Sequence, residues 1–440
     1  MDSQGNTIHL VIEPQSIQFP FKPFLMSSQN PTGTLPDRSM AKRDSHVASQ
    51  NAERKLRIFL LSNVVPENAA GGQVVLYRHL IASSDFVLQH NRPATPRWLN
   101  SRFWKRLKST RLHAACNALE ISATRSSSSR VIFEQARQFG PNIVLTVAHG
   151  RGYDQARDLA ERLNIPLATI FHDWWPDLEE IPPRWRRLEE ARFRSIARAS
   201  EVCFCVSEPM RAQLGSGGNA TVLPPIPGRA RDIPQVLAAG VGTIGYFGSL
   251  YDYGPMVAEL AIASLDEGDV SLEIRTTRLN CPENQVTRLR AAGVLLPFAE
   301  RQDFEKWISG IKAILCVMSF DPSLRRRMET SFPSKLIESL QFGKPVIIWG
   351  PEYCSAVQWA QANQVGHCIT TPVVLEVMAE LQAFLRNDAA QRAASQRAEV
   401  ISKTVFSPQE IHRHFRQELW KVVRRHRRGA QSPAEAHRTI

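Results

Sequence analysis

Residues 330–346 read TSFPSKLIESLQFGKPV, which is the pattern of a loop that runs directly into a helix. Pro333 fixes its own φ and suits the first turn of a helix, and the hydroxyls of Ser331 and Ser334 can cap free amides there. The apolar run at 346–349 follows and is typical of a buried strand. The stretch therefore predicts a helix that begins near Ser334 and leads into a sheet.

The start of this predicted helix also carries groups that could hold a nucleotide. Backbone amides and the positive end of the helix dipole favour an anion, and Lys335 adds an ammonium group beside them. Glu338 follows one turn later on nearly the same face. Its carboxylate could accept hydrogen bonds from the two neighbouring hydroxyls of a ribose. An ordinary helix with a solvated Lys and Glu would show the same residues, so both interpretations stay open here.

The rest of the chain alternates short apolar runs with longer amphipathic ones, on both sides of a proline-dense passage at 223–228. Parallel sheets with helical crossovers produce this alternation. We therefore predict an α/β protein with two Rossmann-like, doubly wound domains. The first is expected to have strands at 56–61, 143–147, 167–171 and 202–206, with helices at 73–82, 154–163 and 186–199. The second is expected to have strands at 243–247, 272–275, 294–296, 313–317 and 346–349.

The length of 440 residues also favours more than one compact core. The first 53 residues are rich in Ser, Gln, Asn and Pro without any sustained period, which indicates disorder. We expect this disordered segment at 1–53, a first domain at 54–228, a second domain at 229–405, and a C-terminal helix with a basic tail at 406–440.

The composition is that of a soluble globular chain, with 43% hydrophobic and 22% charged residues. No run approaches the roughly 18 apolar residues that a membrane span needs, and the first residues do not resemble a secretory signal. We therefore expect a cytoplasmic protein. The seven cysteines contain no Cys-x-x-Cys pair, so neither a disulfide framework nor a zinc site is predicted.

The net charge of +12 is unevenly distributed, because residues 97–111 carry six Arg and Lys side chains among aromatic and apolar ones. Such a segment suits a helix on an anionic membrane surface, which here would be peripheral contact with the inner face. A solvated helix that packs its Trp residues inward fits the pattern equally well. Nucleic acid is not expected as a partner, since no recognised binding motif accompanies the charge.

Polar and glycine residues follow several predicted strands of the first domain. Gly71 and Gly72 end the loop after the first strand, but their spacing is not that of the dinucleotide fingerprint, so no nicotinamide or flavin cofactor is indicated. His149 follows the strand at 143–147, and His172 with Asp173 follows the next. In open α/β sheets these ends line the ligand crevice. A plain turn and hydrogen-bonded loop histidines remain alternatives.

The second domain is expected to open with a strand and a glycine-rich loop at 245–254, which includes Gly248 and Ser249. Backbone amides of such a loop can hold a diphosphate, although a tight turn would look the same. No metal site is predicted, because no set of ligands stands at coordinating spacing around the histidines.

Together these segments resemble the glycosyltransferases of the GT-B fold, and glycosyltransferase family 4 in particular. The resemblance covers roughly residues 55–425, and the last of its five segments is the most specific. It rests on 56–72, 141–149, 204–208, 245–254 and 332–346.

The resemblance implies two domains that face each other across a cleft, with the nucleotide sugar in the second and the acceptor in the first. It assigns Glu338 to the ribose, Lys335 with its neighbours Ser334 and Leu336 to the donor, and His149 to the sugar ring. The loop at Gly72 would approach the diphosphate. Such enzymes usually retain anomeric configuration and use neither metal nor cofactor. The acceptor would be a glycan, a lipid-linked molecule or a small molecule.

Two departures from the family pattern are visible. The family commonly has a second glutamate eight positions before Glu338, where this chain has Thr330, with Glu329 one residue away. We expect His149, Glu329 and Thr330 at the catalytic position. The family also commonly has an Arg and a Lys after the first strand of the second domain, whereas residues 246–258 contain no basic residue here. The phosphate charge would then fall to Lys335, to amides, or to an arginine of 325–327.

Two alternatives compete with glycosyl transfer. An epimerase on the same scaffold would convert the nucleotide sugar without an acceptor, whereas a transferase would not. A non-catalytic scaffold protein would tolerate the loss of Glu338. The base, the sugar and the acceptor depend on loop shapes that one sequence does not specify.

Overall fold

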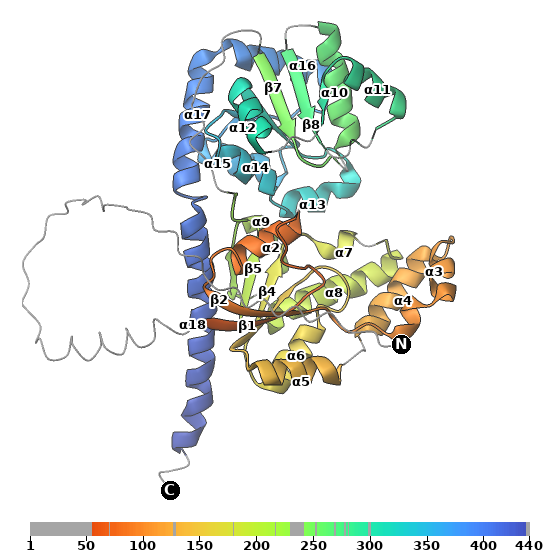
Figure 1. Ribbon diagram of the computed structural model, residues 1–440, viewed down its shortest axis with the longest axis vertical. Helices are drawn as coiled ribbons and strands as arrows, with labels where there is room; N and C mark the ends of the chain where they lie inside the picture. Colours follow the sequence, from red (N-terminus) through yellow and green to blue (C-terminus); the bar gives the residue numbers. More distant parts are fainter. Residues whose placement is uncertain are drawn as a thin grey trace, which may run out of the picture.

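The computed structural model describes residues 55–436, apart from 70, 126–128, 179, 216, 229–241, 251–252, 268–269, 277–278, 280 and 298–300. The segment 1–53, which we expected to be disordered, lies outside these residues. Two sheets with flanking helices lie one above the other in the view of Figure 1. The predicted fold class, two doubly wound parallel-sheet domains, is confirmed.

The first domain is built on six parallel strands in the order β2-β1-β3-β4-β5-β6. The interior strands are almost entirely apolar and buried, as expected for a sheet covered on both faces. The strands are β1 (Leu56–Leu61), β2 (Phe86–Asn91), β3 (Ile143–Val147), β4 (Leu167–Phe171), β5 (Val202–Cys205) and β6 (Ala220–Val222). The helices are α2 (Gly72–Leu80), α3 (Arg102–Lys108), α4 (His113–Arg125), α5 (Arg130–Phe139), α6 (Gln155–Leu163), α7 (Trp175–Leu178), α8 (Pro183–Ala199) and α9 (Glu208–Leu214), with a short 3-10 helix η1 (Arg97–Asn100).

The second domain repeats this plan with six parallel strands in the order β12-β11-β10-β7-β8-β9. Its strands are β7 (Gly242–Phe247), β8 (Val270–Arg275), β9 (Leu295–Leu296), β10 (Ala313–Val317), β11 (Val346–Trp349) and β12 (His367–Ile369). Its helices are α10 (Gly254–Glu267), α11 (Glu283–Ala291), α12 (Arg301–Gly310), α13 (Arg325–Thr330), α14 (Ser334–Leu340), α15 (Ser355–Asn363), α16 (Val374–Arg386) and α17 (Asp388–Lys403), with a 3-10 helix η2 (Pro322–Leu324).

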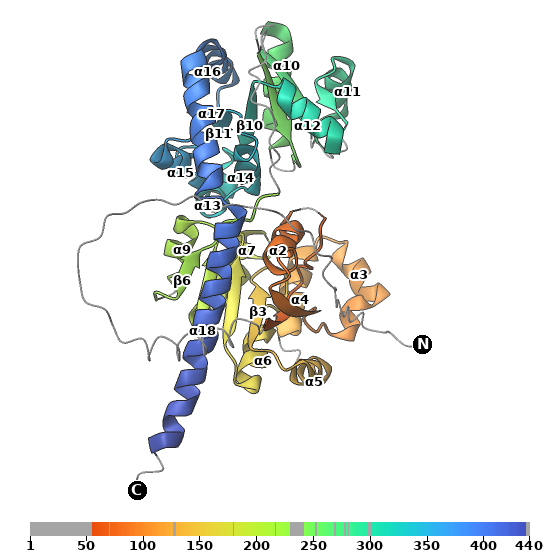
Figure 2. The same ribbon diagram turned by 60° about the vertical axis from the view of Figure 1, so that its left-hand side comes forward.

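A long C-terminal helix, α18 (Pro408–Ala436), follows the second domain but packs along the first, as both views show (Figures 1 and 2). Phe415 is fully buried, with ring contacts to Phe204 of β5 and to Phe86 of β2. The helix that we expected as a separate segment at 406–440 is therefore part of the hydrophobic core of the first domain.

The strand orders fix where a ligand can bind. In the first sheet the chain passes from β1 outward to β2 and then returns to β3 on the other side of β1. In the second sheet it leaves β7 for β8 and β9 and returns to β10 on the other side of β7. A crevice forms at the carboxyl ends of strands where the order reverses in this way. The loops after β1, β3, β7 and β10 are thus the ones that should contribute to a site.

Candidate active site

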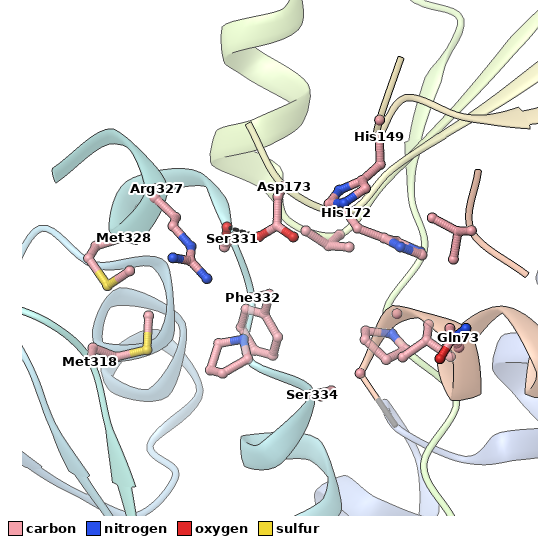
Figure 3. A pocket seen from close by; sticks show the side chains of 18 of the residues that line it. Gln73, His149, His172, Asp173, Met318, Arg327, Met328, Ser331, Phe332 and Ser334 are labelled. Carbon is pink, nitrogen blue, oxygen red and sulfur yellow. Dashed lines mark hydrogen bonds between the residues drawn. The ribbon is translucent and has the colours of Figure 1, made fainter. Parts of the chain in front are cut away.

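Those loops do meet around a cleft of about 680 Å³, lined from both domains (Figure 3). The first domain supplies Asn63 and the Gly71-Gly72 turn after β1, and His149 after β3. The second domain supplies Tyr253 after β7 and, after β10, a wall made of Arg327, Met328 and residues 331–334. The cavity is therefore the interdomain crevice that the two strand orders predict.

The glycine turn after β1 is built for close approach of a ligand. Gly71 has φ 58° and ψ −137°, a conformation that residues with a side chain rarely adopt. A Cβ at Gly72 would lie 3.8 Å from Nδ1 of His172, so the turn faces that histidine across the cleft. Both glycines line the cavity at the start of α2, which leaves backbone amides exposed to it.

Two histidines and an aspartate come together at the first-domain lip, as expected for residues at the ends of β3 and β4 (Figure 3). The ring of His149 lies 4.5 Å from the ring of Trp175. The pKa of His172 is lowered to about 4, chiefly by burial; Asp173 opposes this shift and His149 contributes to it. His172 is therefore neutral at physiological pH and can exchange hydrogen bonds with an uncharged sugar hydroxyl.

The segment after β10 closes the cleft from the other side. The Ser331 hydroxyl donates a 2.8 Å hydrogen bond to Asp173, which joins the two domains at the edge of the cavity (Figure 3). Ser331 therefore does not cap α14, whose N-cap, Pro333, makes no side-chain cap bond. The guanidinium of Arg327 borders the cavity near this contact.

Of the three consecutive arginines, only Arg327 lines the cavity. Arg325 pairs with Glu329 at 2.8 Å and lies over the ring of Tyr353. Arg326 forms ion pairs across the domain boundary with Asp177 at 3.2 Å and Glu190 at 2.9 Å. Arg325 and Arg326 are thus engaged away from the cavity, and Arg327 faces it.

Glu329 and Thr330, expected at the catalytic position, do not line the cavity. Thr330 is fully buried; its hydroxyl donates to the carbonyl of Arg326 at 2.8 Å, and its own carbonyl accepts from Ser207 at 2.5 Å. The carboxylate of Glu329 is engaged by Arg325 on the exposed side of α13. The one-residue shift from the family pattern therefore places this carboxylate away from the cleft.

Lys335 lies beneath the glycine loop that follows β7. Its ammonium contacts the hydroxyl of Tyr246 and lies 3.7 Å from the centre of that ring. A Cβ at Gly248, where φ is +108°, would come within 2.9 Å of Cε of Lys335. Burial lowers the pKa of this lysine to about 8. Ser249, in the same loop, accepts a hydrogen bond from Tyr246 at its carbonyl, 2.9 Å away.

Glu338 occupies an interdomain contact. Its carboxylate forms an ion pair with Arg78 of α2 and accepts from the amide of Gly228 at 3.1 Å to either oxygen. Arg78 also donates to the carbonyl of Ile226 at 2.9 Å. The carboxylate assigned to the ribose is therefore engaged in this structure. Leu336, expected at the donor, is instead fully buried in the core.

Sequence reasoning did not select Arg78 or Trp175. Arg78 stands in the last turn of an amphipathic helix, where a basic residue is common, and no signal links it to a glutamate 260 positions away. Among the described residues, no group of three or more His, Cys, Asp or Glu side chains could hold a metal ion. No helix in that part of the chain is long and apolar enough to cross a membrane.

No family model matches the chain, and no curated protein matches it. Several solved structures do match the chain. Sucrose-phosphate synthase from Thermosynechococcus elongatus matches with a TM-score of 0.56 and 11% identity, over 83% of this chain and 98% of that one. The chain therefore has the GT-B fold. A glycosyltransferase from Rickettsia africae gives 0.55 and 13%, over 84% and 99%. HepE (Alr3699) of Anabaena, in complex with UDP and glucose, gives 0.55 and 14%, over 83% and 100%. Membership of family 4 stays a prediction, because identities this low establish the fold alone.

Proposed function

We propose that this chain is a glycosyltransferase that moves a sugar from a nucleotide diphosphate donor to an acceptor. The observation that carries the proposal is the cleft at the carboxyl ends of both sheets, where Gly71, Gly72, His149 and His172 of one domain face Arg327 of the other. A crevice with exposed amides, a guanidinium and the neutral ring of His172 suits a diphosphate joined to a sugar.

The diphosphate would lie between the amides of the Gly71-Gly72 turn and the cations of the second domain, Arg327 and Lys335. As the bond from the sugar to the diphosphate breaks, negative charge grows on the leaving oxygen, and donors already aimed at that position stabilise it. In this proposal the transfer retains anomeric configuration and needs no metal or cofactor, because side chains and amides meet the charge.

The remaining groups would orient the two substrates. Glu338 would hold the ribose hydroxyls once Arg78 releases it, with Ser334 at the start of α14 beside the donor. His149, His172 and Asp173 would line the place of the transferred sugar and its acceptor. The acceptor would be a glycan, a lipid-linked molecule or a small molecule. The enzyme would work in the cytoplasm, with peripheral contact to the anionic inner face of a membrane.

A panel of nucleotide sugars and nucleoside diphosphates tests the proposal by thermal unfolding. We expect one donor to raise the unfolding midpoint of the wild type, since a ligand that binds only the native state stabilises it. Glu338→Gln should lose most of this shift. Glu329→Gln is the matched control, because it removes a carboxylate of the same segment that lies outside the cleft. A folded protein whose midpoint none of the ligands moves would contradict the proposal.

Product analysis then separates transfer from epimerisation. The selected donor is incubated with the enzyme, with and without candidate acceptors, and the sugar products are identified with their anomeric configuration. We expect turnover that depends on the acceptor and continues in the presence of a chelator. Conversion of the donor sugar to an isomer without an acceptor would instead identify an epimerase.

A further inference from the structure

We propose that the surface formed by η1, α3, α4 and the first turns of α8 binds an anionic lipid bilayer; we call it the α3–α8 face. It is unusually apolar for a solvent-exposed surface. Of the ten large apolar side chains that are exposed in the described part of the chain, five belong to it, and Phe103 is 73% exposed. The five are Trp98, Phe103, Leu112, Leu119 and Leu188.

The same face carries a dense set of basic side chains. Residues 97–112 include no Asp or Glu. Five exposed cations of this segment form no ion pair within the described part of the chain; they are Arg97, Arg102, Lys105, Arg106 and Arg111. Arg184 and Arg187 of α8 are likewise exposed and have no ion pair there. Cations without acidic partners suit an external anionic surface.

Internal contacts hold these elements together as one surface. The buried carboxylate of Glu120 on α4 accepts from the Trp104 indole at 2.5 Å and from Lys108 at 2.7 Å, which fixes α3 on α4. A groove of about 530 Å³ lies between α4 and α8, with Ile121 and Trp185 among its walls. Both ribbon views place α3 and α4 on the side of the first domain away from α18 (Figures 1 and 2).

The combination of charge and ring type argues for lipid as the occupant. A cationic helix with exposed aromatic and leucine side chains can insert these among acyl chains while its Arg and Lys side chains contact anionic headgroups. Nucleic acid would use the cations but would leave Phe103 and Leu112 without a role. An anionic bilayer engages both sets, which is why it fits this face best.

A third contact of Glu120 connects this surface with the cleft. Its carboxylate also pairs with Arg151, which stands two residues after His149, and Asn63 at the cavity wall donates to the carbonyl of Arg151 at 2.5 Å. The α3–α8 face is thus anchored to the loop that lines the site. This step rests on the proposed function, since a bilayer at this face would bring a lipid-linked acceptor beside the acceptor side of the cleft.

The test measures sedimentation of the full chain with phosphatidylcholine vesicles, with and without phosphatidylglycerol. We expect binding to the anionic vesicles only. Replacing Arg102, Lys105 and Arg106 by Gln should lower the partition coefficient about 100-fold, and Phe103→Ser should lower it about tenfold. The matched control replaces Lys421, Arg424 and Arg425 by Gln, which removes the same charge from the exposed side of α18 and should leave binding within about threefold.

Each other outcome would overturn the proposal. Absence of vesicle binding by the wild type would do so directly. An equal loss in the α18 control would show attraction by net charge alone, and full binding by Phe103→Ser would show that no side chain inserts. Stronger binding of a DNA duplex that displaces the vesicles would identify nucleic acid as the partner. Nucleotide-sugar binding, measured on the same variants, should be unchanged, so a failure of the proposed enzyme activity would be recognised separately.

Discussion

Replacing Arg78 by Ala should tighten nucleotide binding while it destabilises the fold. In the structure the guanidinium of Arg78 holds the Glu338 carboxylate from the opposite domain, and both side chains are about three-quarters buried. A ribose needs the acceptor oxygens that this contact occupies. Donor binding must therefore break or weaken the ion pair, and the variant removes that cost in advance.

The expected magnitude follows from the contact. A hydrogen bond to a charged partner contributes about 1.5–3 kcal/mol to stability. We assign about 1 kcal/mol to the ion pair between Arg78 and Glu338, because about a quarter of each side chain is exposed to solvent screening. In the variant Glu338 would still accept the hydrogen bond from the amide of Gly228. The dissociation constant of the donor should then fall about fivefold. The free energy of unfolding without ligand should fall by about the same 1 kcal/mol.

The assay is calorimetric titration of the selected nucleotide sugar, combined with denaturant unfolding of the free protein. Arg326→Ala is the matched control, because Arg326 also forms ion pairs across the domain boundary but does not touch Glu338. The control should lose stability without any gain in donor affinity. Lower donor affinity in Arg78→Ala would refute the competition, since it would mean that Arg78 positions Glu338 for the ribose instead of occupying it.

Three further predictions concern the cations of the second domain. Burial lowers the pKa of Lys335 to about 8, so its side chain is charged below that pH. The donor affinity of the wild type, measured in the same titrations, should therefore fall as the pH rises through 8. Lys335→Met should bind the donor more weakly and show no such pH dependence. Gly248→Ala should lower the free energy of unfolding by about 1–3 kcal/mol, because its φ is +108° and the added Cβ meets Lys335, and a wild-type denaturation curve would contradict this. Arg327→Gln should lower kcat/KM about 100-fold, while Arg325→Gln, which removes a guanidinium paired with Glu329 outside the cavity, should change kcat/KM little.

Much of the fold could be predicted from hydrophobic pattern alone. Interior strands such as Ile143–Val147 and Ala313–Val317 are almost entirely apolar runs between turn residues, and the structure has them at the predicted bounds. The strands that we missed are at or near sheet edges. Only two of the six residues of Phe86–Asn91 are buried, Ala220–Val222 has no buried residue, and His367–Ile369 is three residues long. The hydrophobic pattern of an edge strand is weak, because such a strand has a neighbouring strand on one side only and its side chains are less buried.

The site was predictable where it depends on strand ends and not where it depends on side-chain direction. His149, His172 and the Gly71-Gly72 turn follow directly from strands whose ends must meet. The three arginines at 325–327 could not be separated, because successive residues of a helix point about 100° apart and the sequence does not reveal the orientation of α13. The structure turns Arg327 toward the cleft and the other two away.

The segment from α13 to α14 both lines the cleft and holds the domains together. Arg326 pairs with the first domain through Asp177 and Glu190, Ser331 through Asp173, and Glu338 through Arg78. Every one of these contacts lies within a few residues of Arg327 or Lys335, the cations proposed to meet the diphosphate. A donor that binds to Arg327, Lys335 or Glu338 must therefore alter the interactions between the two domains. Because such a coupling is reciprocal, the domain arrangement must in turn change donor affinity by the same free energy.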